Sequence, residues 1–322
     1  GSDRIGALDF QRSPVEYAPR SPVNASLEEL LRSAERVEKG IPLNADLDEA
    51  LHHGSSIGGA RPKALIEHQN KKYIAKFSST TDIYSVVKAE FIAMRLAKRS
   101  GLQAAEAELT TALGKDVLLI ERFDRIWCKK GWQRRPMLSA LTLLGLDEMM
   151  ARYASYQDLA EIIRHKFTEA PATLKELFAR IVFNILVGNT DDHARNHAAF
   201  WNGETLSLTP AYDICPQGRS GNEATQAMLI GGDNRMSRIS SCLEAAHQYL
   251  LSPADAREIV SYQLTMIGDC WNDVCQQADL GETDRRLLWG RQFLNPFAFD
   301  DLSGENASLR TLSDETRKKN AP

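Results

Sequence analysis

One apolar helix and the loop after it most constrain how this chain can fold. Apolar side chains recur at i, i+1, i+4, i+5, i+8 and i+9, at positions Leu177, Phe178, Ile181, Val182, Ile185 and Leu186. This spacing predicts a helix with a core-facing stripe that ends at Gly188. The next segment, GNTDDHARN at residues 188–196, holds two acids, a histidine and an arginine. Such a density of charge beside a buried helix indicates a functional loop.

Two residues of this loop have the spacing of a kinase catalytic loop. Asp191 and Asn196 form the pattern D-x-x-x-x-N, in which the acid accepts the proton of the substrate hydroxyl and the asparagine holds magnesium. A hairpin predicted over residues 200–209, turning at Asn202-Gly203 with positive φ angles, separates them from Asp213. An acid in that place supplies a further oxygen ligand for Mg2+. The spacing alone is a weak signal, and the order of the residues strengthens it.

The first half of the chain offers residues suited to nucleotide phosphates. The segment GSSIGGARPK, residues 54–63, is rich in glycine and cations and either bends the chain or cradles phosphate. Residues 64–68 and 72–77 predict a hairpin that carries Lys76. A helix is predicted from about residue 84 to 100, with Glu90 on it. A strand lysine fixed by a helical glutamate is how a kinase positions the α- and β-phosphates.

Other patterns set the limits of the predicted elements. Ser26 to Glu29 is a capping box that starts a helix, which Gly40 stops, and a second short helix is predicted to end at Gly54. Residues 117–121 predict a buried strand, and Ser252-Pro253 starts a further helix. Trp271 and Trp289 are expected in the core. These patterns predict an α+β protein with a sheet-containing N-terminal lobe (1–123), a mainly helical C-terminal lobe (124–300) and a polar, solvated tail (301–322).

Composition excludes several classes of function. The 322 residues carry a net charge of -4, which argues against a broad DNA-binding face but leaves local basic patches open. Five cysteines without a C-x-x-C pair predict a reduced, cytosolic chain without a zinc site. No apolar run approaches the roughly 20 residues that span a bilayer, so a cytoplasmic location without a membrane partner is expected. Neither G-x-x-x-x-G-K-[ST] nor G-x-G-x-x-G occurs near Gly54, which excludes P-loop and Rossmann sites.

The candidate residues also have simpler structural explanations. The strand lysine and helical glutamate could form only a surface ion pair, and Asp191 with Asp192 could only cap a turn. His193 and His197 have the i, i+4 spacing of zinc ligands, but no glutamate follows the first histidine and no third ligand is evident. The kinase interpretation therefore depends on several weak signals occurring in the correct order.

The chain resembles the HipA-type serine/threonine kinases, the toxins of HipA-HipB toxin-antitoxin modules. The resemblance extends from about residue 43 to residue 300, and the pair ERFDR and NTDDHARN is highly specific. The matching segments are SSIGGARPKA (55–64), YIAKFS (73–78), KAEFIAMRLAKRSGL (88–102), LLIERFDR (118–125), NTDDHARNHAAF (189–200) and LTPAYDI (208–214). The resemblance implies a bilobal protein-kinase-like fold, with ATP and Mg2+ as cofactors.

The resemblance assigns a role to each candidate residue in the catalytic loop and around it. Lys76, positioned by Glu90, would bind ATP phosphates, and Asp191 would be the catalytic base. Asn196 and Asp213 would hold magnesium. His193 either faces the γ-phosphate or is a plain hydrogen-bonding residue of the loop.

The resemblance also assigns the nucleotide-covering segments. Glu121 and Phe123 would offer backbone hydrogen bonds to adenine at the hinge. Family members phosphorylate themselves on a serine of the glycine-rich loop, which ejects the loop and silences the enzyme; Ser56 fits that position and Ser55 competes with it. The residues expected to cover the phosphates are Ser56, Ile57, Gly58, Gly59, Ala60, Arg61 and Lys63.

Partners follow from the same resemblance. Family toxins phosphorylate aminoacyl-tRNA synthetases, glutamyl-tRNA synthetase prominently, and join operator DNA through a HipB-like helix-turn-helix antitoxin. Typical members carry a further segment before Ile-Gly-Ala-Leu, here residues 5–8, so a truncated chain or a short variant is expected. In some short variants that segment belongs to a separate protein. Two rival functions are a catalytically weak, ATP-binding co-repressor and a small-molecule kinase of the aminoglycoside type.

Overall fold

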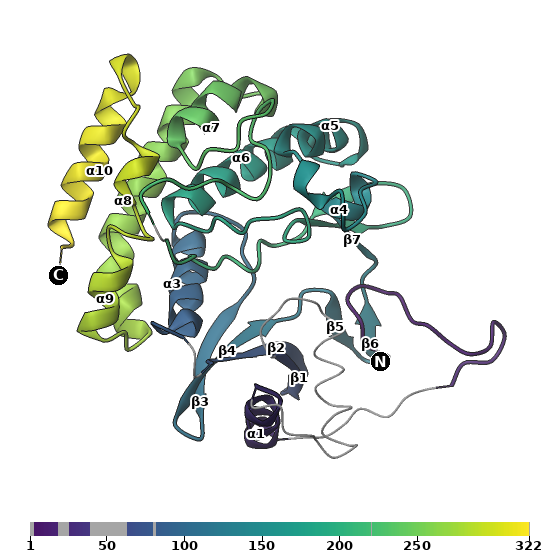
Figure 1. Ribbon diagram of the computed structural model, residues 1–322. Coiled ribbons are helices and arrows are strands. Elements are labelled where there is room, and N and C mark those ends of the chain that lie inside the picture. Colours follow the sequence, from purple (N-terminus) through teal and green to yellow (C-terminus); the bar gives the residue numbers. More distant parts are fainter. Residues whose placement is uncertain (1–2, 19–25, 39–62, 80–81, 220, 322) are drawn as a thin grey trace. The chain divides into compact units, whose positions relative to one another are not determined.

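The computed structural model describes residues 3–18, 26–38, 63–79, 82–219 and 221–321 (Figure 1). The chain divides into two compact units. The first unit comprises Gly1–Lys88 and Ala105–Met137, and the second comprises Ala89–Ala104 and Leu138–Pro322. The first contains most of the described strands and the second most of the helices, so the predicted α+β class is confirmed. The lobe boundary predicted after residue 123 stays a prediction.

A four-stranded antiparallel sheet is the centre of the first unit. Its strands are β1 (Lys63–His68), β2 (Lys71–Phe77), β3 (Ala107–Ala112) and β4 (Lys115–Glu121), in the order β1-β2-β4-β3. The predicted hairpin is confirmed, because β1 pairs with β2 across Gln69 and Asn70. Both turn residues have positive φ angles, of 48° and 58°, as the twist of a two-residue hairpin requires.

Helix α1 (Leu27–Glu38) packs against this sheet. Its predicted capping box is confirmed: Glu29 N donates to Ser26 Oγ at 3.2 Å, and Ser26 N donates to Glu29 Oε2 at 2.8 Å. Leu30 and Leu31 of the helix belong to the same buried cluster as Phe77 of β2. The predicted stop at Gly40 and the short helix ending at Gly54 lie outside the described residues.

A second hairpin of the first unit was not predicted. It pairs β5 (Arg125–Cys128) with β6 (Gly131–Arg134) across a turn of two lysines. Gly131 closes the turn with φ 98°, a conformation that favours glycine. The range 124–300, predicted to be mainly helical, thus begins with a hairpin that was not predicted from the sequence.

The second unit is built around α6 (Ala170–Leu186), in which every residue of the predicted apolar stripe is buried. A small sheet, in the order β7-β8-β9, contains β7 (Met137–Ser139), β8 (Ala198–Trp201) and β9 (Leu206–Leu208). The other helices are α3 (Val86–Arg99, whose first turn belongs to the first unit), α4 (Ala140–Leu143), α5 (Tyr156–Lys166), α7 (Ile239–Ala245), α8 (Pro253–Gln277), α9 (Glu282–Leu288) and α10 (Ala307–Lys319). Short 3-10 turns lie at Ala151–Tyr153, Ala246–Tyr249, Pro296–Ala298 and Gly304–Asn306. None of the described helices is long and apolar enough to span a bilayer.

Two local predictions in the second unit are confirmed and one is wrong. Helix α8 begins at the predicted cap, where Ser252 Oγ accepts from Asp255 N at 3.1 Å. Trp271 is buried and its ring centroid lies 4.5 Å from that of Trp289. The β8–β9 turn is not the predicted Asn-Gly turn, because only Gly203 has a positive φ. Asn202 instead accepts hydrogen bonds from two later amides of the turn through its side chain.

The predicted solvated tail is also wrong. Its residues form α10, which packs beside α8 (Figure 1). The approach is close: a Cβ at Gly268 of α8 would lie 2.5 Å from Thr316 Cγ2, and Asn320 Nδ2 donates to Gly268 O at 3.0 Å. The buried face of α10 carries small and polar residues such as Ser313, so no apolar stripe marks this helix in the sequence.

Candidate active site

The candidate catalytic loop starts where α6 ends against a neighbouring backbone. Gly188 has φ 70°, and a Cβ on it would lie 2.6 Å from the carbonyl oxygen of Gln292. Only glycine meets both conditions without strain. The Gly188 carbonyl also accepts a hydrogen bond of 2.9 Å from Gln217 N. The start of the loop is thereby fixed on two sides.

Successive turns fold the loop back on itself. His193 N donates to Asp191 O at 2.8 Å, and Asn196 N donates to His193 O at 2.8 Å. Asn196 Nδ2 also donates to Asp191 O at 3.4 Å. The structure thus brings the predicted base and the predicted magnesium ligand into one compact loop. Because the Nδ2 group points at the backbone, the Oδ1 atom of Asn196 is the end of the amide suited to a hard cation.

The two adjacent acids of the loop have opposite environments. Asp191 is exposed, whereas the Asp192 side chain is buried. Asp192 Oδ2 accepts hydrogen bonds from Asn184 Nδ2 at 2.7 Å and from the Tyr156 hydroxyl, and it lies 2.9 Å from His197 Nε2. Asp192 therefore fixes the loop from inside, while the neighbouring carboxylate is presented to solvent.

The Asp192 network gives His197 and Tyr156 a structural role. His197 is engaged by a carboxylate through Nε2, so the zinc pairing of His193 with His197 has no support in this geometry. Burial, and then the charge of Asp192, raise the pKa of Tyr156 well above its usual value, which keeps this hydroxyl a donor. Tyr156 and Asn184 were not predicted, because neither stands in a recognisable motif.

Asp213 follows β9 in a left-handed backbone conformation, with φ 59°. Aspartate tolerates this region better than most residues. Its neighbour Tyr212 donates from its hydroxyl to Arg195 O at 2.6 Å, and Ala211 N donates to Gln103 O at 2.7 Å. The Tyr212 bond ties the segment that carries the second predicted magnesium ligand to the catalytic loop. A carboxylate and an amide oxygen are the donor types that Mg2+ takes in proteins, so the residues present fit this cation.

Arg180 holds the same segment from within α6. Its side chain is buried, and it donates to Glu176 Oε1 at 2.8 Å, to Gln103 O at 3.2 Å and to Thr209 O at 2.9 Å. Burial lowers the pKa of Arg180 and the Glu176 carboxylate raises it, with a net lowering. The guanidinium thus joins the residues after α3 to the residues just after β9. Sequence reasoning missed this role because Arg180 lies inside an apolar helix pattern.

His193 follows the two acids in the loop and is half-buried. Its Nδ1 atom is buried and has no hydrogen-bond partner among the described residues. A buried nitrogen in this state can accept or donate a bond to a bound molecule. Its predicted position facing the γ-phosphate stays a prediction.

An exposed apolar segment is attached to the candidate catalytic loop. Met149, Met150 and Tyr153 expose 81%, 44% and 49% of their surface. Glu148 of the same segment forms an ion pair with Arg195, four residues after Asp191. Exposed apolar groups beside a polar loop are typical of surfaces that contact other proteins.

Some of the residues predicted to bind the nucleotide lie outside the described parts of the chain. Lys76 is buried on β2, between Lys63 of β1 and Leu118 of β4. Glu90 is buried on α3 in the second unit, so the Lys76–Glu90 pairing stays a prediction. Among the predicted phosphate-covering residues, those from Ser56 to Arg61 lie outside the described residues, as does Ser55.

The residues predicted to form the hinge lie at the end of β4 and just after it. The backbone amide of Glu121 donates to Glu106 O at 2.9 Å, so only its carbonyl can serve an adenine. Its side chain accepts a hydrogen bond of 2.6 Å from Lys71 Nζ. Phe123 is half-buried in the turn that follows. Contact of either residue with a nucleotide stays a prediction.

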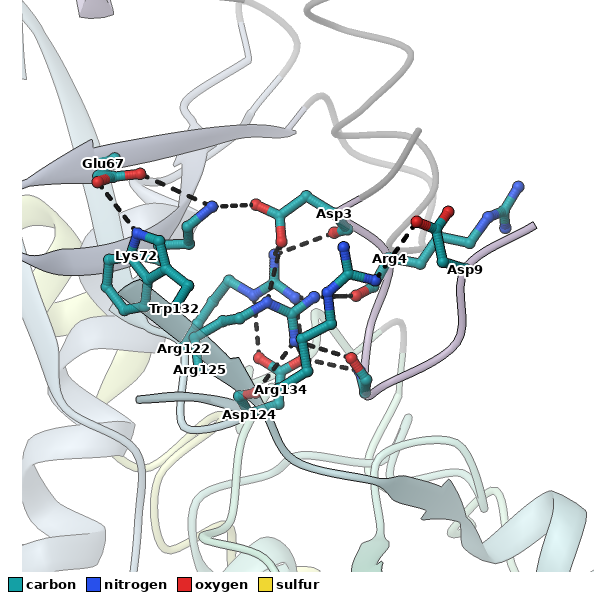
Figure 2. Close-up of polar contacts among 11 residues, drawn as sticks. Asp3, Arg4, Asp9, Glu67, Lys72, Arg122, Asp124, Arg125, Trp132 and Arg134 are labelled. Atoms are coloured by element: carbon teal, nitrogen blue, oxygen red, sulfur yellow. Dashed lines mark hydrogen bonds and ion pairs between the residues drawn. The ribbon is translucent and has the colours of Figure 1, made fainter. Parts of the chain in front are cut away.

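The ERFDR segment forms a buried ion network, which Figure 2 shows. Asp124 accepts from Arg122 and Arg125, each at 2.8 Å, and both arginine side chains are 1% exposed. The two guanidiniums also bind the N-terminal residues, through the Asp3 carboxylate and through backbone carbonyls including Gly6 O. Gly6 N donates to Asp124 Oδ2 at 2.7 Å. The specific motif thus anchors residues 3–6 to the sheet unit.

The chain matches known proteins along most of its length. A family model described as the HipA-like C-terminal domain matches residues 55–271. Y4mE of Sinorhizobium fredii is 29% identical over 153 residues, which is 46% of this chain and 35% of that protein. The serine/threonine-protein kinase toxin HipA of Shewanella oneidensis is 26% identical over 183 residues, 49% of this chain and 42% of that protein. The chain spans about half or less of the length of these curated relatives.

One solved structure shows the fold. It is the Shewanella oneidensis HipA in complex with HipB and operator DNA, and the match covers 98% of this chain and 75% of that one, with a TM-score of 0.71 and 19% sequence identity. At this identity the match establishes the fold alone. The predicted kinase-like fold class is thereby confirmed.

Proposed function

Because the chain belongs to the family of the HipA-like C-terminal domain, we propose that it is an ATP-dependent protein serine/threonine kinase. The observation that carries the proposal is the loop of Asp191 and Asn196, in which one acid is buried and fixed and its neighbour is exposed. A fixed loop holds the exposed carboxylate of Asp191 where a substrate hydroxyl can reach it.

Each predicted residue would have a separate task in the reaction. Asp191 would orient the hydroxyl and accept its proton, and Lys76, positioned by Glu90, would bind the phosphates. Asn196 and Asp213 would hold the cation through oxygen atoms. ATP would supply the phosphoryl group and Mg2+ would compensate its charge. Glu121 O and the backbone of Phe123 would bind adenine, under a loop of residues 56–61 with Lys63.

Three features of the proposal come from the family resemblance. The chain would act as the toxin of a type II toxin-antitoxin module, with a HipB-like antitoxin that brings it to operator DNA. Its substrate would be an aminoacyl-tRNA synthetase, with glutamyl-tRNA synthetase favoured. Phosphorylation of Ser56 would silence it, because a phosphate adds nearly two negative charges beside the nucleotide phosphates. The exposed Met149, Met150 and Tyr153 favour a protein substrate over a small molecule.

Transfer of labelled phosphate from ATP tests the proposal. The purified chain is incubated with labelled ATP and Mg2+, alone and with glutamyl-tRNA synthetase, and phosphoserine is mapped by mass spectrometry. Asp191→Ala is expected to lower transfer about 100- to 10,000-fold, because it removes the base and the orienting group. Asp233→Ala, an exposed acid of the same unit, should leave transfer unchanged. Undiminished transfer by Asp191→Ala would contradict the assignment.

The second candidate function is a catalytically weak co-repressor. The left-handed Asp213 and the Asn196 amide would then hold ATP and a cation without turnover. Tight ATP binding without phosphate transfer, together with tighter operator binding by the antitoxin when this chain is added, would favour it over the kinase.

A further inference from the structure

The β5–β6 hairpin concentrates positive charge on an acidic protein. Residues 125–135 (RIWCKKGWQRR) contain five lysines and arginines and no acid, while the whole chain has a net charge of -4. The rest of the chain therefore carries a net charge of -9. A polyanion would be repelled by most of this protein and attracted to this short segment.

The two lysines of the turn are available to a ligand. Lys129 and Lys130 connect the two strands and are exposed. No ion pair or hydrogen bond joins either ammonium to another residue of the described chain. The other cations are engaged in part, since Arg125 is buried in the ERFDR network and Arg134 lies 3.8 Å from Asp9. The turn lysines are thus the groups free to neutralise anions.

A supported aromatic side chain lies on the same hairpin. Trp127 faces Trp132 directly across the strands, with ring centroids 5.2 Å apart in an edge-on arrangement. Trp132 is held in turn, because its indole N–H donates to Glu67 at 3.1 Å and Lys72 lies 5.4 Å from its ring centroid (Figure 2). Trp127 nevertheless exposes 47% of its surface. The exposed ring is therefore positioned by a fixed neighbour.

We propose that the β5–β6 hairpin binds a single-stranded nucleic acid. A base stacks on the exposed ring of Trp127, and the ammonium groups of Lys129 and Lys130 pair with the phosphates on either side of it. Stacking on an aromatic side chain together with phosphate pairing is the common mode of single-strand binding. A duplex buries its base faces and does not offer them to the indole, and an acidic protein surface would use the lysines but leave the ring without a partner.

A second hairpin of the same chain serves as a control. Trp201 on β8 is also 47% exposed, but its turn carries Glu204 and no lysine or arginine. It has the same aromatic exposure without the cations. If exposed tryptophan alone caused binding, both hairpins would contribute equally.

Fluorescence anisotropy of a labelled oligonucleotide with the full chain tests the proposal. The probes are a twelve-nucleotide uridine RNA, the thymidine DNA of the same length, and a duplex of that length. We expect Trp127→Ala to weaken single-strand binding about 5- to 150-fold. Lys129→Ala with Lys130→Ala should reduce the slope of log affinity against log salt by about 1.4. Trp201→Ala should change neither quantity.

The arms of the experiment separate the sources and the rivals. Equal binding of the RNA and the DNA supports recognition through phosphates and base faces, and preference for RNA supports an added contact to the 2′-hydroxyl. Duplex binding as tight as single-strand binding would overturn the proposal. Single-strand affinity that is unchanged both in Trp127→Ala and in Lys129→Ala with Lys130→Ala would also overturn it. Binding of polyglutamate in place of the oligonucleotides would overturn it as well.

Discussion

Replacing Asp192 with alanine is expected to lower the free energy of unfolding by about 3–5 kcal/mol. The same replacement at the adjacent Asp191 is expected to change it by less than about 0.5 kcal/mol. The two residues have the same side chain and differ in environment, since only the Asp192 carboxylate is buried. The comparison isolates the buried network from the chemistry of the loop.

The magnitude follows from the groups that the change would leave without a partner. Asp192 Oδ2 accepts hydrogen bonds from Asn184 Nδ2, from the Tyr156 hydroxyl and from His197 Nε2. A buried donor that loses its acceptor costs about 1–3 kcal/mol. Partial relaxation of three such groups gives the total of about 3–5 kcal/mol, which is a large part of the stability of a typical domain.

Urea denaturation, followed by tryptophan fluorescence, measures the free energy of unfolding of Asp192→Ala and Asp191→Ala. A double-mutant cycle with Tyr156→Phe sharpens the test. Alone, Tyr156→Phe should cost about 1.5–3 kcal/mol, because it removes one bond to a charged acceptor. In the Asp192→Ala background it should cost clearly less, because the hydroxyl has lost its carboxylate acceptor and keeps only the 3.3 Å bond to the backbone carbonyl of residue 192.

Equal stability of Asp192→Ala and Asp191→Ala would refute the reasoning. So would a cost of Tyr156→Phe that is the same in both backgrounds, since the hydroxyl would then act independently of Asp192. Phosphate transfer separates the two acids in the opposite way. Asp191→Ala should remain folded and lose transfer.

Three further outcomes are expected. Burial raises the pKa of Asp3, but Arg122, Lys72 and Arg125 lower it to a net value of about 2. The Asp3 carboxylate therefore adds up to about 2 kcal/mol to the free energy of unfolding above pH 4, and this contribution is lost as the pH falls toward 2. Urea denaturation of Asp3→Asn at several pH values should lack that pH dependence. Gly188→Ala should destabilise the chain by more than about 2 kcal/mol, because alanine is strained in the left-handed conformation and its Cβ would clash with Gln292. A thermal melting curve identical to that of the parent chain would rule out this cost. Burial raises the pKa of Cys275 to about 12, so iodoacetamide at pH 8 should modify it far more slowly than the half-buried Cys270, and equal rates would contradict its burial.

The sequence predicted well those elements whose signals are local. The β1–β2 turn, the α1 capping box and the start of α8 each depend on side chains within four residues of one another. The apolar stripe of α6 is periodic and therefore visible. The loop of Asp191 and Asn196 was predicted from the spacing that kinases use; the structure brings the two residues into one compact loop, and their roles stay predictions.

The missed features depend on distant contacts. Helix α10 packs through Gly268 of α8, some fifty residues away. Its buried face mixes Leu309 with the polar Ser313 and Thr316, so its own sequence shows no continuous apolar stripe. Asp192 and Asp191 are identical as letters, and only the positions of Tyr156 and Asn184 decide which acid is buried. Hairpin β5–β6 has only a short strand on each side of its turn, which is too little for a reliable alternation pattern.

The buried guanidinium of Arg180 on α6 couples the positions of two segments of the second unit, the one after α3 and the one after β9. Gln103 O accepts hydrogen bonds from the Arg180 guanidinium and from the backbone amide of Ala211. Ala211 lies two residues before Asp213. A displacement of the Asp213 segment would break these buried bonds unless the residues following α3 moved with it. If Asp213 holds the proposed cation, its position is thereby linked to the segment that follows the helix carrying Glu90.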